Sequence, residues 1–364
     1  MILMSDRLHT SSLNSPIVVE RIRHLPVGGR MKDIPPHLWH DSYVRVGEKK
    51  TGGPNLRLLR LDPDQPSNTV TAYIFNKFAH YSEDRYITPR EAARLQQFPD
   101  SHEFVGPITS VQLQIGNAVP VGLARAVARH VDARMKSNNT CLDRKAVSLF
   151  SGAGGMDLGF SDYFNIQSAN EIESNFAATL ARNFSSTHVL SSDVTDIDGS
   201  ELSDSEVDLV FGGPPCQPFS AAGKHRGVDD PRGGLVKEYF RIVSELSPSY
   251  FVLENVPGLL SNAKGGALKF VLEQAEKIGY ASEYFVLNAT DFGVPQLRNR
   301  LFVIGRRDKS EAPLGRPLAT HCLPDRQGNL LLPSCMTVGE AFAGLGKPTV
   351  RTLNRHKGVA VVDS

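Results

Sequence analysis

Short apolar runs alternate with amphipathic stretches of helical length through the middle of the chain. The apolar runs are "AVSLF" (146–150), "VDLVF" (207–211), "YFVLENV" (250–256) and "RLFVIG" (300–305). The stretches between them include "GLVKEYFRIVSEL" (234–246) and "ALKFVLEQAEKIG" (267–279), in which apolar residues recur with helical spacing. Strands that alternate with helices in this way predict an α/β fold built on a doubly wound, mostly parallel sheet.

Two helices are also predicted upstream of the first apolar run. In "TPREAARLQQFP" (88–99), Thr88 and Glu91 have the spacing of a capping box, and Pro89 suits the first helical position. The stretch "VPVGLARAVARHVDARM" (119–135) has helical periodicity, and the polar "KSNNT" (136–140) after it predicts a linker. Residues 1–70 hold many prolines, glycines and short basic pieces, so we expect an irregular small domain outside the sheet.

The composition is ordinary for a globular protein, with 40% hydrophobic and 22% charged residues. No apolar run approaches the roughly 18 residues of a membrane helix, and the first residues lack the pattern of a signal peptide. The four cysteines form no CxxC pair, which argues against a zinc site and against a disulfide framework. They are Cys141, Cys216, Cys322 and Cys335. We therefore expect a cytoplasmic protein with free thiols and no metal.

Charge is distributed unevenly, although the formal net charge is only +1. Residues 1–70 hold 10 Lys/Arg and 7 Asp/Glu, and residues 351–364 hold 3 and 1. The 280 residues between them hold 27 Lys/Arg and 31 Asp/Glu. Basic chain ends are typical of a surface that faces a polyanion. Ordinary solvated faces explain the charge equally well.

A glycine-rich turn follows the first predicted strand. The segment "FSGAGGMDLGF" (150–160) opens a helix, and its glycines let the main chain approach a ligand closely. Glu171 follows the second strand, where it can accept hydrogen bonds from ribose hydroxyls, and Asp193 follows the third, where it can hold an adenine amino group. A nicotinamide-dependent dehydrogenase would have a similar turn, and some such turns bind nothing. Asp193 is equally well explained as a solvated turn carboxylate.

A second group of residues surrounds one cysteine. The segment "GGPPCQPFS" (212–220) holds Cys216 behind two glycines and two prolines, at the carboxyl end of a strand where doubly wound folds bind ligands. Glu254 ends the next strand, and a carboxylate near a thiol suggests a proton donor beside a nucleophile. Arg298 and Arg300 stand two apart at a strand start, which puts both guanidinium groups on one face. Taken alone, the arginines are better explained by surface ion pairs.

Together, six segments resemble motifs of the DNA (cytosine-5)-methyltransferase family, whose members use S-adenosylmethionine. They are "FSGAGGMDLGF", "GGPPCQPFS", "ENVPGLL", "QLRNRLFVIG", "TPREAARLQQFP" and "QIGNAVP", and they span residues 88–305. In the usual family order "QIGNAVP" comes last, whereas here it occupies residues 114–120, ahead of the glycine-rich turn. The chain therefore resembles a circularly permuted member of the bacterial restriction-modification type.

The resemblance implies a Rossmann-like catalytic domain and a smaller target-recognition domain. The implied parts are the main recognition part (1–87), a helical part of the catalytic domain (88–135), a linker (136–145), the Rossmann-like catalytic domain (146–345) and the start of the recognition region (346–364). "NRHKG" (354–358) and "ERIRHLPVGGRMKDIPPHL" (20–38) resemble pieces of one recognition region. Permutation is tolerated where termini lie close together on the surface, so we expect the two ends to build one domain.

The same resemblance implies roles for individual residues. Cys216 would add to carbon 6 of a flipped-out cytosine, Glu254 would hydrogen-bond ring nitrogen 3, and Arg300, with Arg298 as a second candidate, would hold the carbonyl oxygen. "SAAGKHRGVDDPRGG" (220–234) resembles the mobile loop that closes over the base. The residues implied to line the cofactor site are Phe150, Gly152, Gly154, Glu171, Ile172, Asp193, Val194 and Leu235, with Asn117, Ala118 and Val119 beside the methionine moiety. Ile172 replaces the tryptophan of some members, so weaker stacking on adenine is expected.

The implied substrate is double-stranded DNA with a short specific site, bound by a monomer at the bacterial nucleoid. A cognate restriction endonuclease that acts on the same site is the partner the family suggests, without a stable complex and without a membrane. The nearest alternative is a tRNA cytosine-5 methyltransferase of the same family, whose members have little recognition domain. A catalytically dead DNA-binding regulator is a further alternative, which intact Cys216 and Glu254 disfavour.

Overall fold

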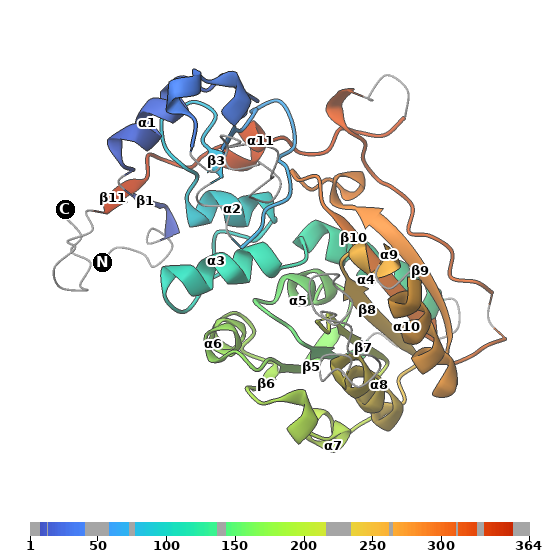
Figure 1. Cartoon of the computed structure of the whole chain (residues 1–364). Helices are drawn as coiled ribbons and strands as arrows, with labels where there is room; N and C mark the ends of the chain where they lie inside the picture. Colours follow the sequence, from blue (N-terminus) through green and yellow to red (C-terminus); the bar gives the residue numbers. More distant parts are fainter. Residues whose placement is uncertain are drawn as a thin grey trace.

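A seven-stranded sheet forms the centre of the protein (Figure 1). The computed structural model describes residues 8–12, 14–40, 58–72, 77–136, 143–215, 234–261, 265–310, 312–325 and 331–351. The strand order is β6-β5-β4-β7-β8-β10-β9. The strands are β4 (Lys145–Leu149), β5 (Asn165–Asn170), β6 (His188–Leu190), β7 (Leu209–Gly212), β8 (Tyr250–Asn255), β9 (Ala281–Asn288) and β10 (Asn299–Arg306). Only β10 runs antiparallel to its neighbours, so the predicted mostly parallel sheet is confirmed.

The central strands send alternate side chains into two separate apolar layers. In β7, Leu209 and Phe211 join one layer, and Val210 joins the other. In β10, Phe302 and Val303 divide between the layers in the same way. A strand that is buried on both faces has apolar residues at every position, and this explains the continuous apolar runs of the sequence.

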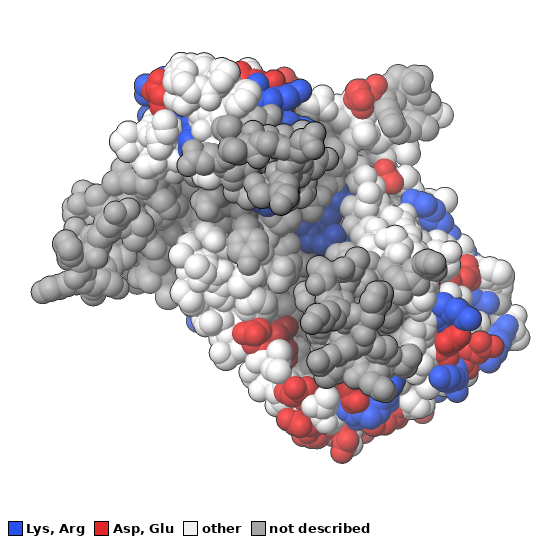
Figure 2. All heavy atoms as spheres, in the orientation of Figure 1, with Lys and Arg blue, Asp and Glu red and all other residues white. Residues whose placement is uncertain are grey.

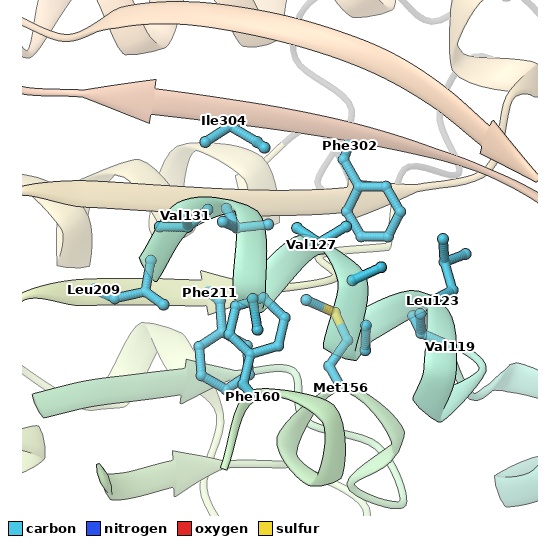
Figure 3. Packing of buried hydrophobic residues seen from close by; sticks show 14 of the residues in the cluster. Val119, Leu123, Val127, Val131, Met156, Phe160, Leu209, Phe211, Phe302 and Ile304 are labelled. Atoms are coloured by element: carbon cyan, nitrogen blue, oxygen red, sulfur yellow. The ribbon is translucent and has the colours of Figure 1, made fainter. Parts of the chain in front are cut away.

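Helices cover both faces of the sheet. On one face, α4 (Val121–Lys136) packs against α5 (Gly155–Phe160), and on the other lie α8 (Gly234–Leu246) and α10 (Gly266–Lys277). Figure 3 shows Leu123 and Val127 of α4 within the same layer as Phe160 of α5, whose ring stacks on Phe211 at a centroid distance of 4.3 Å. The helix that precedes the first strand of the sheet thus packs beside the helix that follows it.

The remaining elements are shorter and lie around this sheet. The helices are α1 (Pro16–Arg23), α2 (Pro89–Leu95), α3 (Ile108–Asn117), α6 (Ser174–Asn183), α7 (Gly199–Leu202), α9 (Gly258–Ser261) and α11 (Val338–Phe342). The single-turn helices are η2 (Met31–Asp33), η3 (Pro36–Leu38), η5 (Val194–Asp196) and η7 (Ala289–Phe292). At α2, Thr88 accepts a hydrogen bond from the Glu91 N–H and the Glu91 carboxylate accepts one from the Thr88 N–H, so the predicted capping box is confirmed.

The two ends of the described chain pair with each other. Strands β1 (Thr10–Ser12) and β11 (Thr349–Arg351) form a parallel two-stranded sheet, and β2 (Leu59–Arg60) pairs with β3 (Phe78–Ala79) in another. Figure 1 places β1, β11 and α1 together at the upper left, away from the large sheet. We call the described residues 8–40, 58–72, 77–87 and 346–351 the end lobe. Its elements are short, and the expectation of a separate small domain stays a prediction.

Two predicted boundaries differ from the structure. Helix α4 continues to Lys136 and β4 begins at Lys145, so the connection between them is shorter than the linker expected over 136–145. The buried side chains of Asp132 and Arg144 form an ion pair that joins the end of α4 to the start of β4. Strand β9 was not predicted, because its sequence "ASEYFVLN" mixes polar and apolar residues, as is usual for a strand at the sheet edge.

Candidate active site

A cavity of about 240 Å³ lies beyond the carboxyl ends of the parallel strands. Strand β4 is the first strand of the seven-stranded sheet along the chain, and it lies between β5 and β7. The direction in which successive strands are added therefore reverses at β4. Doubly wound folds bind ligands at such a reversal. Eight predicted site residues line the cavity: Asn117, Ala118, Val119, Phe150, Gly152, Glu171, Ile172 and Glu254.

The glycine-rich turn after β4 has an unusual main-chain conformation. Phe150, Gly152 and Gly154 all have positive φ, at 54°, 61° and 81°. A non-glycine residue rarely adopts such a conformation, and strain of this kind gathers at ligand sites. A Cβ atom on Gly152 would meet no atom within 4 Å, whereas one on Gly154 would lie 2.5 Å from the ring of Phe184. Gly152 therefore faces the cavity, and Gly154 permits close packing behind the turn.

Glu171 forms the wall next to this turn. Its carboxylate accepts hydrogen bonds from the N–H groups of Gly152, at 2.8 Å, and Glu173, at 2.9 Å. Burial raises the pKa of Glu171 despite these bonds. Each carboxylate oxygen retains a lone pair, so Glu171 can also accept hydrogen bonds from the hydroxyls of a ligand. Ile172 beside it is 60% exposed and offers an apolar surface.

The opposite wall comes from the junction of α3 and α4, residues 117–119. Gln114 fixes this junction, because its side chain accepts a hydrogen bond of 2.7 Å from Thr179 on α6 and donates one of 2.8 Å to the Val105 carbonyl. A Cβ atom on Gly116 would lie 2.2 Å from the main-chain nitrogen of Ala72. The segment before the cavity wall is thus held between α6 and the end lobe.

Four of the predicted cofactor residues are not among the residues that line the cavity. They are Gly154, Asp193, Val194 and Leu235. Asp193 caps η5 by accepting a hydrogen bond of 3.0 Å from the Thr195 N–H, and Val194 and Leu235 belong to the apolar layer under α8. Nothing in the described residues tests whether Asp193, Val194 and Leu235 contact a bound ligand, so their roles stay predictions.

Glu254 lies in the same cavity, at the end of β8. Its carboxylate forms an ion pair with Arg300 of β10, with 2.7 Å between Nε and Oε1, and both side chains are almost buried. Burial raises the pKa of Glu254, and the two arginines oppose this shift without cancelling it. A Cβ atom on Gly213 would lie 2.9 Å from the Glu254 carboxylate, so the glycine leaves room for that side chain. Burial thus favours the protonated form of Glu254 more than it is favoured in an exposed carboxyl group.

Arg298 has a different environment from Arg300, although the sequence predicted similar positions for both. Its guanidinium donates hydrogen bonds to the Val70 carbonyl and, at 2.9 Å, to the Gly116 carbonyl. The side chain is 2% exposed. Arg298 therefore ties the end lobe to the cavity wall, and Arg300 is the better candidate for contact with a substrate.

The segment that leads to Cys216 is anchored to β8. The side-chain amide of Asn255 donates a hydrogen bond of 2.9 Å to the Pro214 carbonyl, and Pro215 lines the cavity. Cys216 and nearly all of the expected mobile loop, up to residue 233, lie outside the described residues. Sequence reasoning named neither Gly213 nor Asn255 as a site residue. The sequence could have indicated both, because Gly213 directly precedes Pro214 and Asn255 directly follows Glu254.

Figure 2 shows a hollow between the end lobe and the sheet, and Lys and Arg atoms are visible inside it. Asp and Glu atoms gather at the opposite end, near α7.

A larger open groove of about 550 Å³ lies elsewhere, against α4, and contains none of the predicted site residues. Among the described residues, no cluster of His, Cys, Asp and Glu could hold a metal ion, and no helix could span a membrane.

Known proteins share this sequence pattern. The family described as C-5 cytosine-specific DNA methylase matches residues 31–133 and 144–330. The Type II methyltransferase M.AquIA of Picosynechococcus is 45% identical over 181 residues, which are 46% of this chain and 73% of that protein. The Type II methyltransferase M.NgoPII of Neisseria gonorrhoeae is 36% identical over 233 residues, which are 58% of this chain and 68% of that protein.

One solved structure with a related sequence is a DNA modification methyltransferase encoded within an E. coli prophage. It shares 29% identity and a TM-score of 0.45 with this chain, over 56% of each. The chain thus spans little more than half of that structure. A doubly wound sheet with a glycine-rich turn and a buried acid at one ligand cavity defines an α/β ligand-binding enzyme. The family match covers most of the sequence, and the chain belongs to the C-5 cytosine-specific DNA methylases.

Proposed function

We propose that the protein transfers a methyl group from S-adenosylmethionine to carbon 5 of a cytosine in DNA, through a covalent bond to Cys216. The observation that carries this proposal is one shared cavity. It is lined by the glycine-rich turn, Glu171, Glu254 and Pro215, the residue directly before Cys216. A cofactor site and a proton-donating acid at the root of a cysteine loop are the parts that this reaction needs.

The residues around the turn fit S-adenosylmethionine. Gly152 presents open space to the cavity, and Glu171 retains acceptor capacity for ribose hydroxyls. The exposed side chain of Ile172 suits the face of an adenine, and Asn117 and Val119 close the other wall. When bound, the cofactor supplies an electrophilic methyl group.

The proposed task of Cys216 is to make carbon 5 reactive. Its thiolate would add to carbon 6, which moves ring electrons toward nitrogen 3 and leaves carbon 5 enamine-like. A free thiol has a pKa of about 8.5 and needs a local cation or helix end to ionise more readily. The hydrogen bond from Asn255 to Pro214 holds the start of this loop before the substrate arrives, which reduces the entropy lost on the way to the transition state.

Glu254 and Arg300 would act on the cytosine ring itself. In this proposal Glu254, whose pKa is raised by burial, donates a proton to nitrogen 3 as the thiolate adds. Arg300, already paired with Glu254, would then hold the carbonyl oxygen of the base. After carbon 5 has been methylated, a base removes its remaining proton and the thiolate leaves. Our candidate for that base is a water molecule.

The proposed substrate is duplex DNA from which the cytosine is flipped out, because the reacting atoms are inaccessible in a stacked helix. The hollow between the end lobe and the sheet would receive the DNA, since cationic groups lie within it and acidic groups lie at the far end (Figure 2). Both relatives described above are named Type II methyltransferases. This proposal includes a partner restriction endonuclease that acts on the same DNA site, and it places the methyltransferase at the nucleoid.

We further propose that the chain is a circularly permuted member of its family. Three contacts support this arrangement. Strands β1 and β11 join the two ends, His9 hydrogen-bonds both Thr88 and the Gly346 carbonyl, and α4 packs against α5. In this proposal the end lobe, completed by residues at both termini, recognises the target sequence.

Trapping the covalent intermediate tests the proposed function. DNA with 5-fluorocytosine at the target lacks the proton that must leave carbon 5, so wild-type protein should form an adduct that survives denaturation. Cys216→Ala should form none and should still bind S-adenosylhomocysteine, because the thiol does not hold the cofactor. Methyl transfer by the alanine variant would overturn the role of Cys216. Side-by-side assays on DNA and tRNA decide between the two nucleic-acid substrates.

A further inference from the structure

Two buried glutamines lie between the end lobe and the cavity wall, and neither was predicted as a site residue. Gln96 directly follows α2, and Gln296 precedes β10. Both residues are 0% exposed. The side-chain amide of Gln296 donates a hydrogen bond of 2.9 Å to the side-chain oxygen of Gln96. Burying two amides is favourable only if their remaining donors and acceptors also find partners, so the contacts at both ends of this pair matter.

One end of the pair is held by the end lobe. The N–H of Val70 donates a hydrogen bond of 2.8 Å to the side-chain oxygen of Gln296, whose amide nitrogen also donates one of 3.1 Å to the Leu95 carbonyl. With a donor on one side and an acceptor on the other, only one orientation of the Gln296 amide satisfies both groups. That orientation points N–H groups at Gln96, so Gln96 turns its oxygen toward Gln296 and its own N–H groups away.

The other end of the pair holds the junction of α3 and α4. The amide nitrogen of Gln96 donates a hydrogen bond of 2.7 Å to the Ile115 carbonyl and one of 3.4 Å to the Ala118 carbonyl. The main-chain carbonyl of Gln96 accepts a hydrogen bond of 3.0 Å from the N–H of Val121, the first residue of α4. The last carbonyls and the first N–H groups of a helix have no partner within it. Gln96 therefore provides partners at the end of one helix and at the start of the next.

The residues between these contacts form part of the cavity wall. Asn117, Ala118 and Val119 line the cavity, and neither glutamine is among the residues that line it. The two amides thus lie behind the wall, and their hydrogen bonds connect it to the main chain of the end lobe. A buried polar network is stabilising when every member has its partners and costly when one is lost.

We propose that Gln96 and Gln296 are positioning residues for the cofactor: their amides, oriented by Val70 of the end lobe, hold residues 117–119 in the place where S-adenosylmethionine binds. This inference rests on the proposed function. Gln96 acts through the cavity wall, and Gln296 acts through Gln96. The affinity for the cofactor therefore depends on a main-chain group of the end lobe.

Methionine substitutions test this role, because methionine has nearly the length of glutamine and lacks the amide. We expect the dissociation constant for S-adenosylhomocysteine, measured by calorimetry without DNA, to rise about tenfold in Gln96→Met and about threefold in Gln296→Met. The smaller effect is expected for Gln296, because it is one hydrogen bond further from the wall. In methylation assays, the rise in KM for the cofactor should exceed any fall in kcat.

Gln97→Met is the matched control. Gln97 is the next residue in the chain, and its amide donates a hydrogen bond of 3.1 Å to the Gly293 carbonyl. It lines the larger open groove and is not among the residues of the cofactor cavity. The affinity of this variant for S-adenosylhomocysteine should equal that of wild type. The proposal is overturned if Gln96→Met binds S-adenosylhomocysteine as tightly as Gln97→Met.

The double variant separates a chain of amides from two independent structural contacts. If Gln296 acts through Gln96, the variant with both substitutions should bind S-adenosylhomocysteine no more weakly than Gln96→Met alone. A further threefold loss, on the order of the effect expected for Gln296→Met by itself, would show that Gln296 acts independently and would overturn the proposed chain.

Amide hydrogen exchange gives a readout that needs neither activity nor ligand. The N–H groups of Ala118 and Val121 should exchange faster in unliganded Gln96→Met and Gln296→Met than in Gln97→Met. Equal exchange in the three variants would contradict the inference even if the proposed cofactor were wrong. If wild type fails to bind S-adenosylhomocysteine while the exchange difference is present, the proposed function fails and the positioning of the wall stands.

Wild-type protein offers a further test if the methionine variants do not fold. In a protein labelled with ¹⁵N in the glutamine side chains, the amide signals of Gln96 and Gln296 should shift when S-adenosylhomocysteine is added. The signals of Gln97 should not shift. A ligand-induced change at Gln97 with none at Gln96 would contradict the proposal.

Discussion

The large sheet and the end lobe are built by different means. The sheet buries two continuous apolar layers under long helices. The end lobe has strands of two or three residues and a small apolar cluster of its own, made of Ile22, Leu25, Met31, Ile34, Leu38, Leu58 and Ala79. Periodic burial of apolar side chains thus organises the sheet, and it organises very little of the lobe.

Individual hydrogen bonds between side chains and the main chain hold much of the end lobe together. Arg21 donates a hydrogen bond of 2.6 Å to the Leu38 carbonyl, and the indole of Trp39 donates one of 3.0 Å to the Ile34 carbonyl. His9 links the first described residues to Thr88 and Gly346. Each such contact contributes only about 1 kcal/mol. A region held in this way tolerates sequence changes at little cost in stability, which agrees with the proposed role of the end lobe in selecting a DNA target.

The two regions meet through a shared apolar cluster, which includes Val70 and Phe78 of the end lobe and Val121 of α4, and along a short seam of polar contacts. Ser67 and Gln296 pair as isolated strand residues, Thr69 donates a hydrogen bond of 2.7 Å to the Leu297 carbonyl, and Arg298 donates to the Val70 carbonyl. Arg300 follows directly on the sheet side. The proposed catalytic residues and the proposed recognition lobe are therefore only a few residues apart, and substitutions on either side of the seam should have different consequences.

The largest expected effect is on the sheet side. Glu254→Gln keeps the shape of the side chain and removes the acid, so kcat should fall by roughly 10²-fold or more. Glu273→Gln is the control, because Glu273 forms an exposed ion pair with Lys269 on α10. Methylation rates on target DNA, with circular dichroism to confirm folding, measure the difference. Turnover by Glu254→Gln within a few-fold of wild type would remove Glu254 from the mechanism.

A substitution at the seam should lower the stability of the protein more than its activity. Arg298→Met leaves the carbonyls of Val70 and Gly116 without their donor, and we expect a loss of roughly 3 kcal/mol in the free energy of unfolding. Arg300→Met should mainly lower the methylation rate. Urea denaturation and kinetics on both variants test this division. If Arg298→Met instead lowered the methylation rate and kept its stability, Arg298 would be a catalytic candidate again.

The sheet side should also respond to pH through Asp157, which is buried at the start of α5 with no hydrogen-bond partner for either carboxylate oxygen. Burial raises its pKa from 3.8 to about 7. The folded state favours the protonated form, so stability is greatest below the unfolded pKa and is lost as pH rises toward the folded pKa.

Asp157→Asn should remove this dependence, giving the variant a relative gain of roughly 2 kcal/mol between about pH 5 and about pH 8. Urea denaturation at both pH values is the measurement. Asp162→Asn, at an exposed ion pair with Arg125, should leave the pH dependence of the wild type intact. A parallel pH profile for Asp157→Asn and wild type would show that Asp157 is ionised in the folded protein.

The smallest effect is expected from moving the chain ends. A chain opened between residues 139 and 140, with Ser364 joined to Met1 by a short flexible linker, leaves α4 and β4 whole. Loop-closure entropy changes slowly with length, so the activity should stay within a few-fold of the parent. Bisulfite mapping should find the same methylated site. A folded rearranged protein with another target, or with none, would show that the two ends do not build one recognition domain.

The sequence alone predicted the sheet, its main strands and helices, and eight of the residues that line the cavity. Continuous apolar runs mark strands that are covered on both faces, and glycines and prolines mark the turns between them. Such local patterns also located Glu171, Glu254 and the cap at Thr88. The edge strand β9 escaped prediction, because one exposed face removes the pattern.

Only the tertiary structure decided what depends on contacts between distant segments. It separated Arg298 from Arg300, two residues of the same type on one strand face, because one meets the carbonyls of Val70 and Gly116 and the other meets Glu254. It left Asp193 outside the cavity wall. Burial and hydrogen-bond partners are set by residues far apart in the chain, and no local pattern of side chains encodes them.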